Sequence, residues 1–156
     1  MEYKSYLKIN VKILVYHFCL VVLGTGIIGV NWNGPVINET MLLTFIVMLF
    51  LHFVVGFLLR NNHSWFVNAI SVSFVLIINL VMYFYSLLFS SELPSLVNVL
   101  VIIFKFPFLY ILGWQDINYP LLAAVLPCLF LWLGLETRSI VHRLSKRKES
   151  NSRNSK

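Results

Sequence analysis

The chain has 156 residues, of which 59% are hydrophobic and only 12% are charged. A soluble domain has about 45–50% apolar and about 25% charged residues. The apolar residues also gather in long runs, which excludes a soluble enzyme, a DNA-binding domain, a disulfide scaffold and a disordered tail. Both cysteines, Cys19 and Cys128, lie inside these runs and do not indicate an extracellular disulfide framework. The composition predicts an integral membrane protein.

Five apolar runs follow one another along the chain, and each is close to the ~20 residues that a helix needs to cross a bilayer. They cover residues 13–30, 41–59, 67–89, 97–113 and 117–135. An isolated strand would leave its backbone groups unpaired in lipid, so the runs are predicted to be helices. The predicted fold class is therefore all-α: a polytopic integral membrane protein with four to five transmembrane helices in a small bundle. A basic N-terminus (1–12) and a basic, partly disordered tail (136–156) flank this bundle.

The distribution of lysine and arginine predicts the orientation, because cytoplasmic loops carry an excess of both. The tail 136–156 is basic, which places the C-terminus in the cytoplasm. If the run 97–113 only enters from the outside, four spans remain and the basic N-terminus is also cytoplasmic. If that run crosses, the N-terminus lies outside. The charge rule favours the cytoplasmic N-terminus, whereas the apolar content of 97–113 favours its insertion.

The amino-acid composition also indicates the kind of organism that the chain comes from. The chain contains three alanines, Ala69, Ala123 and Ala124, among abundant Phe, Ile, Leu and Asn. This bias is typical of an AT-rich genome and favours the cell membrane of a Gram-positive bacterium.

Motifs for catalysis, metal binding or cofactor binding are not found. The acidic residues Glu39, Glu92, Asp116 and Glu136 all lie at the ends of runs, which disfavours a proton-coupled pump with a buried acid. Residues 24–29 match G-x-G-x-x-G, but a spanning helix precedes them where the dinucleotide motif needs a strand. We interpret these glycines as a small-residue face that allows another helix to approach closely.

Two stripes at helical spacing place polar side chains on one face of the second and third runs. The first stripe is Thr44, Met48, His52 and Gly56, and the second is Asn68, Ser71, Val75, Asn79, Tyr83 and Ser86. Polar side chains in a span turn away from lipid, so both stripes are expected to face the bundle interior. Because His52 and Asn79 lie at similar depth, a hydrogen bond between them is predicted. The candidate pathway or binding residues are therefore His52, Asn79, Asn68 and Tyr83, and the alternative is that they only hold helices together.

The remaining candidate residues are cationic side chains and one histidine. Lys105 lies in the middle of the run 97–113, and it either attracts an anionic headgroup or solute or extends to the outer headgroups. His17 is expected to be a hydrogen-bonded structural histidine near the cytoplasmic end of its run. In the tail, a short interfacial helix is expected. Its candidate contacts with anionic lipids are Arg143, Lys146, Arg147 and Lys148, although a basic cluster is also an ordinary topological signal.

Three classes of function remain open. The first is an accessory, assembly or immunity-type protein that acts through helix–helix contacts with another membrane protein. The second is a subunit of an oligomeric transporter or channel for a small or anionic solute, and the third is an enzyme that acts on lipid. The expected partners are the bilayer, with anionic lipids at the cytoplasmic face, and either another membrane protein or further copies of the chain. Nucleic acid is not expected, because a basic folded surface is lacking, and no cofactor is indicated.

Overall fold

A computed structural model describes residues 3–30, 39–59, 65–88 and 120–154 of the chain. These residues form helices and contain no strand, which confirms the all-α prediction. The helices are α1 (Tyr3–Val30), α2 (Glu39–Leu58), α3 (Trp65–Leu88) and α5 (Pro120–Asn154). Three stretches are long and apolar enough to cross a membrane: Leu7–Val30, Trp65–Tyr85 and Ala124–Lys148. The apolar stretch of α2, Leu42–Leu58, is shorter. The helices are thus consistent with a membrane location.

The observed bounds differ from the sequence prediction mainly at the two ends of the chain. α1 begins at Tyr3, ten residues before the expected span 13–30, so most of the basic segment 1–12 is helical. α5 continues to Asn154 as one helix, although the span was expected to end near residue 135 and to precede a separate short helix. The reason is that no glycine or proline follows Gly134, so nothing interrupts helical hydrogen bonding. The run 97–113, with Lys105, lies outside the described residues.

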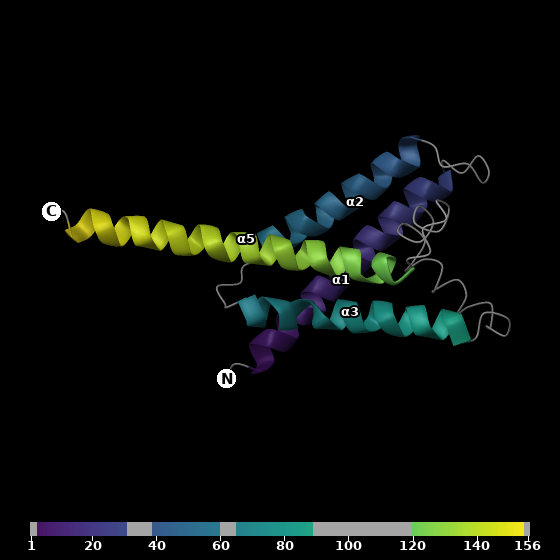
Figure 1. The fold of residues 1–156 in the computed structure, drawn as a ribbon, viewed down its shortest axis with the longest axis horizontal. Helices are drawn as coiled ribbons and strands as arrows, with labels where there is room; N and C mark the ends of the chain where they lie inside the picture. The colour runs from purple at the N-terminus through teal and green to yellow at the C-terminus, as the bar shows by residue number, and fades with distance from the viewer. Residues whose placement is uncertain (1–2, 31–38, 60–64, 89–119, 155–156) are drawn as a thin grey trace.

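Successive helices run in opposite directions through the bundle (Figure 1). α1 and α5 each pack against both α2 and α3. At one end of the bundle α1 begins, α2 ends and α3 begins, and α5 extends beyond this end toward the C-terminus. We call this the tail end, and the opposite end, where α5 begins, the far end. This arrangement brings the start of α3 close to the second half of α5.

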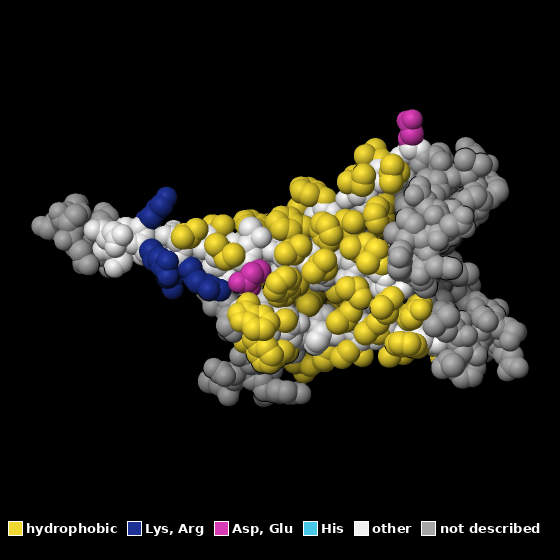
Figure 2. Space-filling view, in the orientation of Figure 1, with side chains coloured by type: hydrophobic (Ala, Val, Ile, Leu, Met, Phe, Trp, Pro, Cys, Tyr) yellow, Lys and Arg dark blue, Asp and Glu magenta, His cyan; other side chains and the backbone are white. Residues whose placement is uncertain are grey.

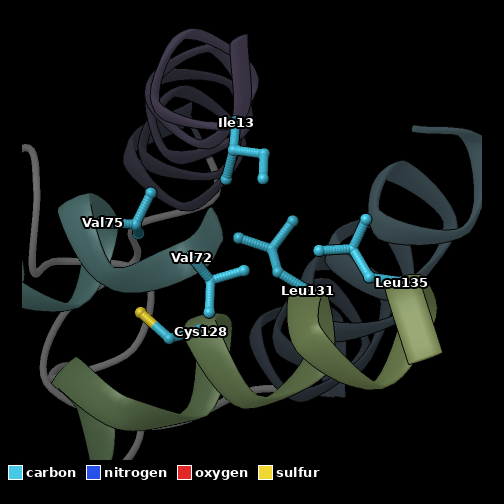
Figure 3. Packing of buried hydrophobic residues seen from close by; sticks show 6 residues of the cluster. All are labelled: Ile13, Val72, Val75, Cys128, Leu131 and Leu135. Atoms are coloured by element: carbon cyan, nitrogen blue, oxygen red, sulfur yellow. The ribbon is translucent and has the colours of Figure 1, made fainter. Parts of the chain in front are cut away.

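Apolar side chains make up both the interior and most of the outer surface. The main core cluster joins α1, α3 and α5 (Figure 3) and consists of Ile13, Val72, Val75, Cys128, Leu131 and Leu135. A second cluster of Val21, Met48 and Leu49 lies between α1 and α2. Large hydrophobic side chains also cover the outside of the bundle (Figure 2), as expected where lipid replaces water as the solvent.

α2 and α5 touch backbone to backbone at a pair of glycines. A Cβ atom added to Gly56 would collide with the carbonyl oxygen of Leu131, and one added to Gly134 would collide with the carbonyl oxygen of Phe53. Small residues allow membrane helices to approach this closely. The small-residue face expected at 24–29 is realised in part. Gly24 faces the side chain of Met48, whereas Gly26 and Gly29 meet open space.

The glycine contact predicts that Gly134→Ala lowers the free energy of unfolding in mixed micelles by about 1–3 kcal/mol, because the helices must move apart. Gly26→Ala is the matched control. Its new methyl group meets nothing within 4 Å, so it should leave stability unchanged or raise it through alanine's higher helix propensity. Equal effects of the two substitutions would contradict the assigned packing of α2 on α5.

Candidate functional site

A chain of polar contacts crosses the middle of the bundle and involves all four helices. His17 of α1 lies between His52 of α2 and Asn79 of α3, and we call these three residues the polar junction. The Nδ1 atom of His17 is 3.0 Å from Nε2 of His52, and its Nε2 atom is 3.4 Å from Oδ1 of Asn79. The two imidazole rings meet edge to face, with centroids 5.2 Å apart. All three side chains are buried, with exposed fractions of 1%, 0% and 6% in chain order.

The junction ends on α5, next to a proline. Asn79 Nδ2 donates to the carbonyl oxygen of Ala124 at 3.3 Å and lies 3.8 Å from Sγ of Cys128. Pro127 has no N–H group, so the turn of α5 that precedes it lacks one helical hydrogen bond. The carbonyl that loses its helical donor is that of Ala123, whereas the carbonyl of Ala124, which Asn79 contacts, also lies 3.7 Å from Sγ of Cys128.

The other end of the junction lies within α2. Nδ1 of His52 is 2.7 Å from the carbonyl oxygen of Met48, one turn earlier in the same helix. A carbonyl oxygen can only accept, so this nitrogen must carry the hydrogen. This bond orients the ring and turns the Nε2 atom of His52 toward α1.

Both polar stripes predicted from the sequence face the bundle interior. Thr44, Met48, His52 and Gly56 are all buried, as the four-residue spacing predicts. On α3 the buried members are Asn68, Ser71, Val75 and Asn79, while Tyr83 is half-buried. The prediction of a direct hydrogen bond between His52 and Asn79 needs a correction, because His17 stands between them and contacts both.

The apolar run 13–30 predicts His17 near one end of its span. The helix begins at Tyr3, which puts His17 at its middle. The lysines at 4, 8 and 12 obscure this position, since charged residues usually mark the membrane boundary. The missed signal is the seven-residue spacing of Asn10 and His17, which places both on the same buried face as Ile13 and Val21.

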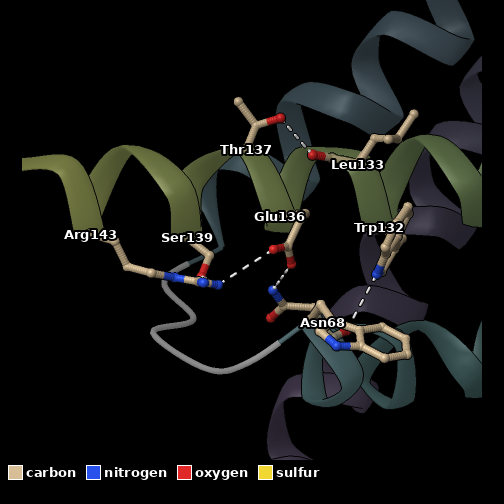
Figure 4. A network of polar contacts seen from close by, with 8 residues as sticks. Asn68, Trp132, Leu133, Glu136, Thr137, Ser139 and Arg143 are labelled. Carbon is tan, nitrogen blue, oxygen red and sulfur yellow. Dashed lines mark hydrogen bonds and ion pairs between the residues drawn. The ribbon is translucent and has the colours of Figure 1, made fainter.

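A second polar network joins α3 to α5 at the tail end (Figure 4). Asn68 Nδ2 donates to Oε2 of Glu136 at 2.8 Å. The guanidinium of Arg143 forms a 3.4 Å ion pair with Oε1 of Glu136 and donates to Ser139 at 3.0 Å. Asn68 is fully buried, and its Oδ1 atom has no hydrogen-bond partner.

Glu136 follows the apolar run 117–135, which predicts a position at the membrane boundary. In the structure it lies further inside the bundle. Its side chain is 18% exposed, because it faces α3. The outward face of α5 remains apolar for two more turns, with Ile140, Val141 and Leu144 about half exposed. The sequence shows this continuation at helical spacing after Leu133, but the basic residues between these positions obscure it.

The cationic residues of α5 divide into two groups. Arg138 donates to the carbonyl oxygen of Phe57 at 3.0 Å and lies over its ring at 5.7 Å, so it caps the C-terminus of α2. Lys146, Arg147 and Lys148 are exposed on the part of α5 beyond the bundle (Figure 2). Arg143 contributes to both regions, because it is exposed and still pairs with Glu136.

The described residues contain no group of three or more His, Cys, Asp or Glu side chains that could hold a metal ion. A cavity of about 120 Å³ is lined by Val55, Leu58, Leu59 and Tyr16, and its walls are mostly apolar. Comparison with known proteins gives no similarity, since no protein family, no curated protein and no solved structure matches this chain.

The contact of His17 with Asn79 predicts a measurable coupling between the two positions. In a double-mutant cycle of His17→Leu and Asn79→Leu, we expect a coupling free energy between about 0.6 and about 1.7 kcal/mol, typical of hydrogen bonds between membrane helices. Unfolding in mixed micelles measures it. Val15→Ala and Ile77→Ala, both on outward faces with 54% exposure, form the control cycle and should show no coupling. A vanishing coupling in the first cycle would refute the contact.

Proposed function

We propose that the protein is an accessory, assembly or immunity-type protein of the cell membrane that acts through helix–helix contacts with another membrane protein. The observation that favours this proposal is the use of the buried polar groups. His17, His52 and Asn79 contact one another and the backbone of neighbouring helices, so these groups serve the association of helices. A protein whose role is to present helices to a partner needs a bundle held together in this way and needs no catalytic motif.

In the proposed topology the chain passes the cell membrane several times, with both termini in the cytoplasm. Support comes from the charges of the described helices. Lys8 and Lys12 are exposed at the tail end, as are Arg143, Lys146, Arg147 and Lys148 of α5, whereas Glu39 is exposed at the far end. Because cytoplasmic segments carry an excess of positive charge, this distribution supports a cytoplasmic tail end.

The proposed lipid contact is the basic cluster of Arg143, Lys146, Arg147 and Lys148 on α5, at the headgroups of the cytoplasmic leaflet. The outward face of α5 presents exposed leucine or isoleucine from Leu122 to Leu144, which at 1.5 Å per residue is about 33 Å of helix. This length matches a hydrocarbon core of about 30 Å. Lys146, Arg147 and Lys148 follow in the next turn, at the level where anionic lipids attract each cation by about 1 kcal/mol.

A second candidate is the subunit of an oligomeric transporter or channel for a small or anionic solute. The polar junction favours it, because two histidines and an asparagine in the middle of a membrane bundle are typical of ion and proton pathways. Lys105, which the sequence indicates as a further candidate for such a pathway, lies outside the described residues. Substitutions at the junction would then abolish flux while the protein still inserted into the membrane.

The test of the accessory role begins with crosslinking in the native membrane, purification in mild detergent and mass spectrometry of the intact complex. We expect stoichiometric recovery with a different membrane protein. Three variants on outward faces then locate the contact: Leu23→Ala on α1, Phe50→Ala on α2 and Phe74→Ala on α3, whose side chains are 52%, 60% and 38% exposed.

At least one of these three variants should lower recovery of the partner several-fold without changing the stability of the purified chain, since none of the three side chains is in the core. Recovery of the chain only as a homo-oligomer would contradict the accessory role and favour the transporter subunit. If all three variants still recover the partner as well as the original chain does, the contact does not use these faces. That result would also count against the proposal.

The proposed topology predicts opposite labelling of two introduced cysteines. Thr40→Cys at the far end and Ser150→Cys on α5 are both at exposed positions. In a Cys19→Ser background, a membrane-impermeant maleimide added to intact cells should label Thr40→Cys, and it should label Ser150→Cys only after lysis. Labelling of Ser150→Cys in intact cells would place the tail end outside and reverse the proposed orientation.

A further inference from the structure

α1 and α2 touch in the middle of the bundle and near its far end, but they separate toward the tail end (Figure 1). In the middle His17 contacts His52, and closer to the far end Gly24 faces Met48. Beyond His52, α2 follows α5, where Gly56 lies against the backbone of that helix, whereas α1 packs against α3. The cavity of about 120 Å³ lies where the two helices separate.

This cavity has an apolar inner wall and opens to the outside of the bundle. Val55 and Leu59 form the inner wall, since both also pack against the main core cluster. Leu58 and Tyr16 form the rim and are 65% and 48% exposed. Apolar cavities of about 150 Å³ bind a molecule as large as benzene. The cavity therefore fits a segment of one hydrocarbon chain, whereas a helix, with a diameter of about 10 Å, could only lie over the rim.

Two cations on α1 follow the cavity toward the tail end. Lys12 lies one turn before Tyr16 on the same side of α1, Lys8 lies one turn further, and both lysines are exposed. At 1.5 Å per residue, Lys12 on α1 and Leu58 on α2 lie about 8 and about 9 Å from the contact between the two histidines. Lys12 is therefore level with the tail-end limit of the cavity.

The tail-end limit of the cavity carries net positive charge. α1 contains no aspartate or glutamate between residues 3 and 30, and the single acidic residue of α2, Glu39, lies at the far end. The negative end of the α2 dipole also lies here, but Arg138 caps it. Lys8 and Lys12 thus have no acidic partner on either helix that forms the cavity.

Lys12 also leaves α1 at a depth where hydrocarbon surrounds the bundle. Its neighbour Ile13 belongs to the same core cluster as Leu135 (Figure 3). The outward face of α5 stays apolar as far as Leu144, about 13 Å beyond Leu135. A cation at such a depth is costly unless it is paired, and a lysine here extends its stem toward the headgroups. An anion that reaches Lys12 from the headgroup layer is therefore stabilised.

We propose that the cavity, together with Lys8 and Lys12, is a binding site for one anionic phospholipid. One acyl chain enters the cavity between Tyr16 and Leu58, and the phosphate accepts hydrogen bonds from the two ammonium groups. The order of the groups in a phospholipid, with the charged head outermost and the chain further inside, matches the order of the lysines and the cavity. Tyr16 lies where head and chain join, an environment that suits its apolar ring and polar hydroxyl.

This site is separate from the basic cluster of α5, which lies on the part of that helix beyond the bundle. The proposal needs only the membrane location of the bundle. It holds for an accessory protein and for a transporter subunit, and it holds in whichever leaflet the tail end lies.

The first measurement uses the purified full chain in vesicles of phosphatidylcholine with a minor fraction of phosphatidylglycerol that carries a diazirine in one acyl chain. After irradiation, mass spectrometry of the digested chain should place crosslinks on Tyr16, Val55 and Leu58. Excess unlabelled phosphatidylglycerol should suppress these crosslinks, and the same excess of phosphatidylcholine should not. Crosslinks spread evenly over the outward faces of all the helices would overturn the proposal. Since no other protein is present, a negative result here leaves the accessory role untouched.

The second measurement counts retained lipid by mass spectrometry of the intact protein in mild detergent. We expect one phosphatidylglycerol per chain, and Lys12→Gln should weaken its binding about fivefold, the effect of losing one cation beside an anionic lipid. Lys146→Gln, at an exposed position on α5, is the matched control and should leave the retained lipid unchanged. Equal effects of the two substitutions, or equal retention of phosphatidylcholine by the original chain, would overturn the proposal.

A third variant separates the cavity from the charges. Val55→Phe fills the cavity while both lysines remain, so the retained lipid should be lost. Retention of lipid by folded Val55→Phe would show that the lysines bind lipid without the cavity and would overturn the proposal. Recovery of a lipid-free dimer from the same vesicles would assign the cavity to a second copy of the chain, with the same consequence. Lys12→Gln changes only an exposed side chain, so the test does not depend on whether Val55→Phe folds.

Discussion

A polar side chain inside an apolar bundle must find its hydrogen-bond partner within the bundle, and this constraint fixes how the four described helices are set against one another. His17, His52 and Asn79 meet at one level, and Asn79 links this level to the backbone of α5. Sliding any of these helices by one turn, about 5.4 Å, would separate the partners. Apolar contacts alone specify such a register poorly, because lipid is as good a neighbour for leucine as another helix is.

The glycine contact and the capping arginine depend on the register that the junction sets. Gly56 and Gly134 permit backbone contact only where they face each other, and Arg138 reaches the last turn of α2 only at the same alignment. α5 then presents an apolar face to the outside as far as Leu144, while its inner face is polar from Glu136 onward. The interior of the tail-end half thus combines the main apolar core cluster with the polar contacts of Asn68, Glu136 and Ser139.

Sequence patterns predicted the helices and the inward faces of α2 and α3, because spacing of three and four residues is a property of the helix alone. The same patterns could not identify the partner of His52, since depth in the membrane had to be estimated from where each run begins. Lysines near the start of α1 shifted that estimate, and His17 was placed away from the centre. Glu136 was misplaced for a related reason: one helix can be polar on its inner face and apolar on its outer face at the same depth.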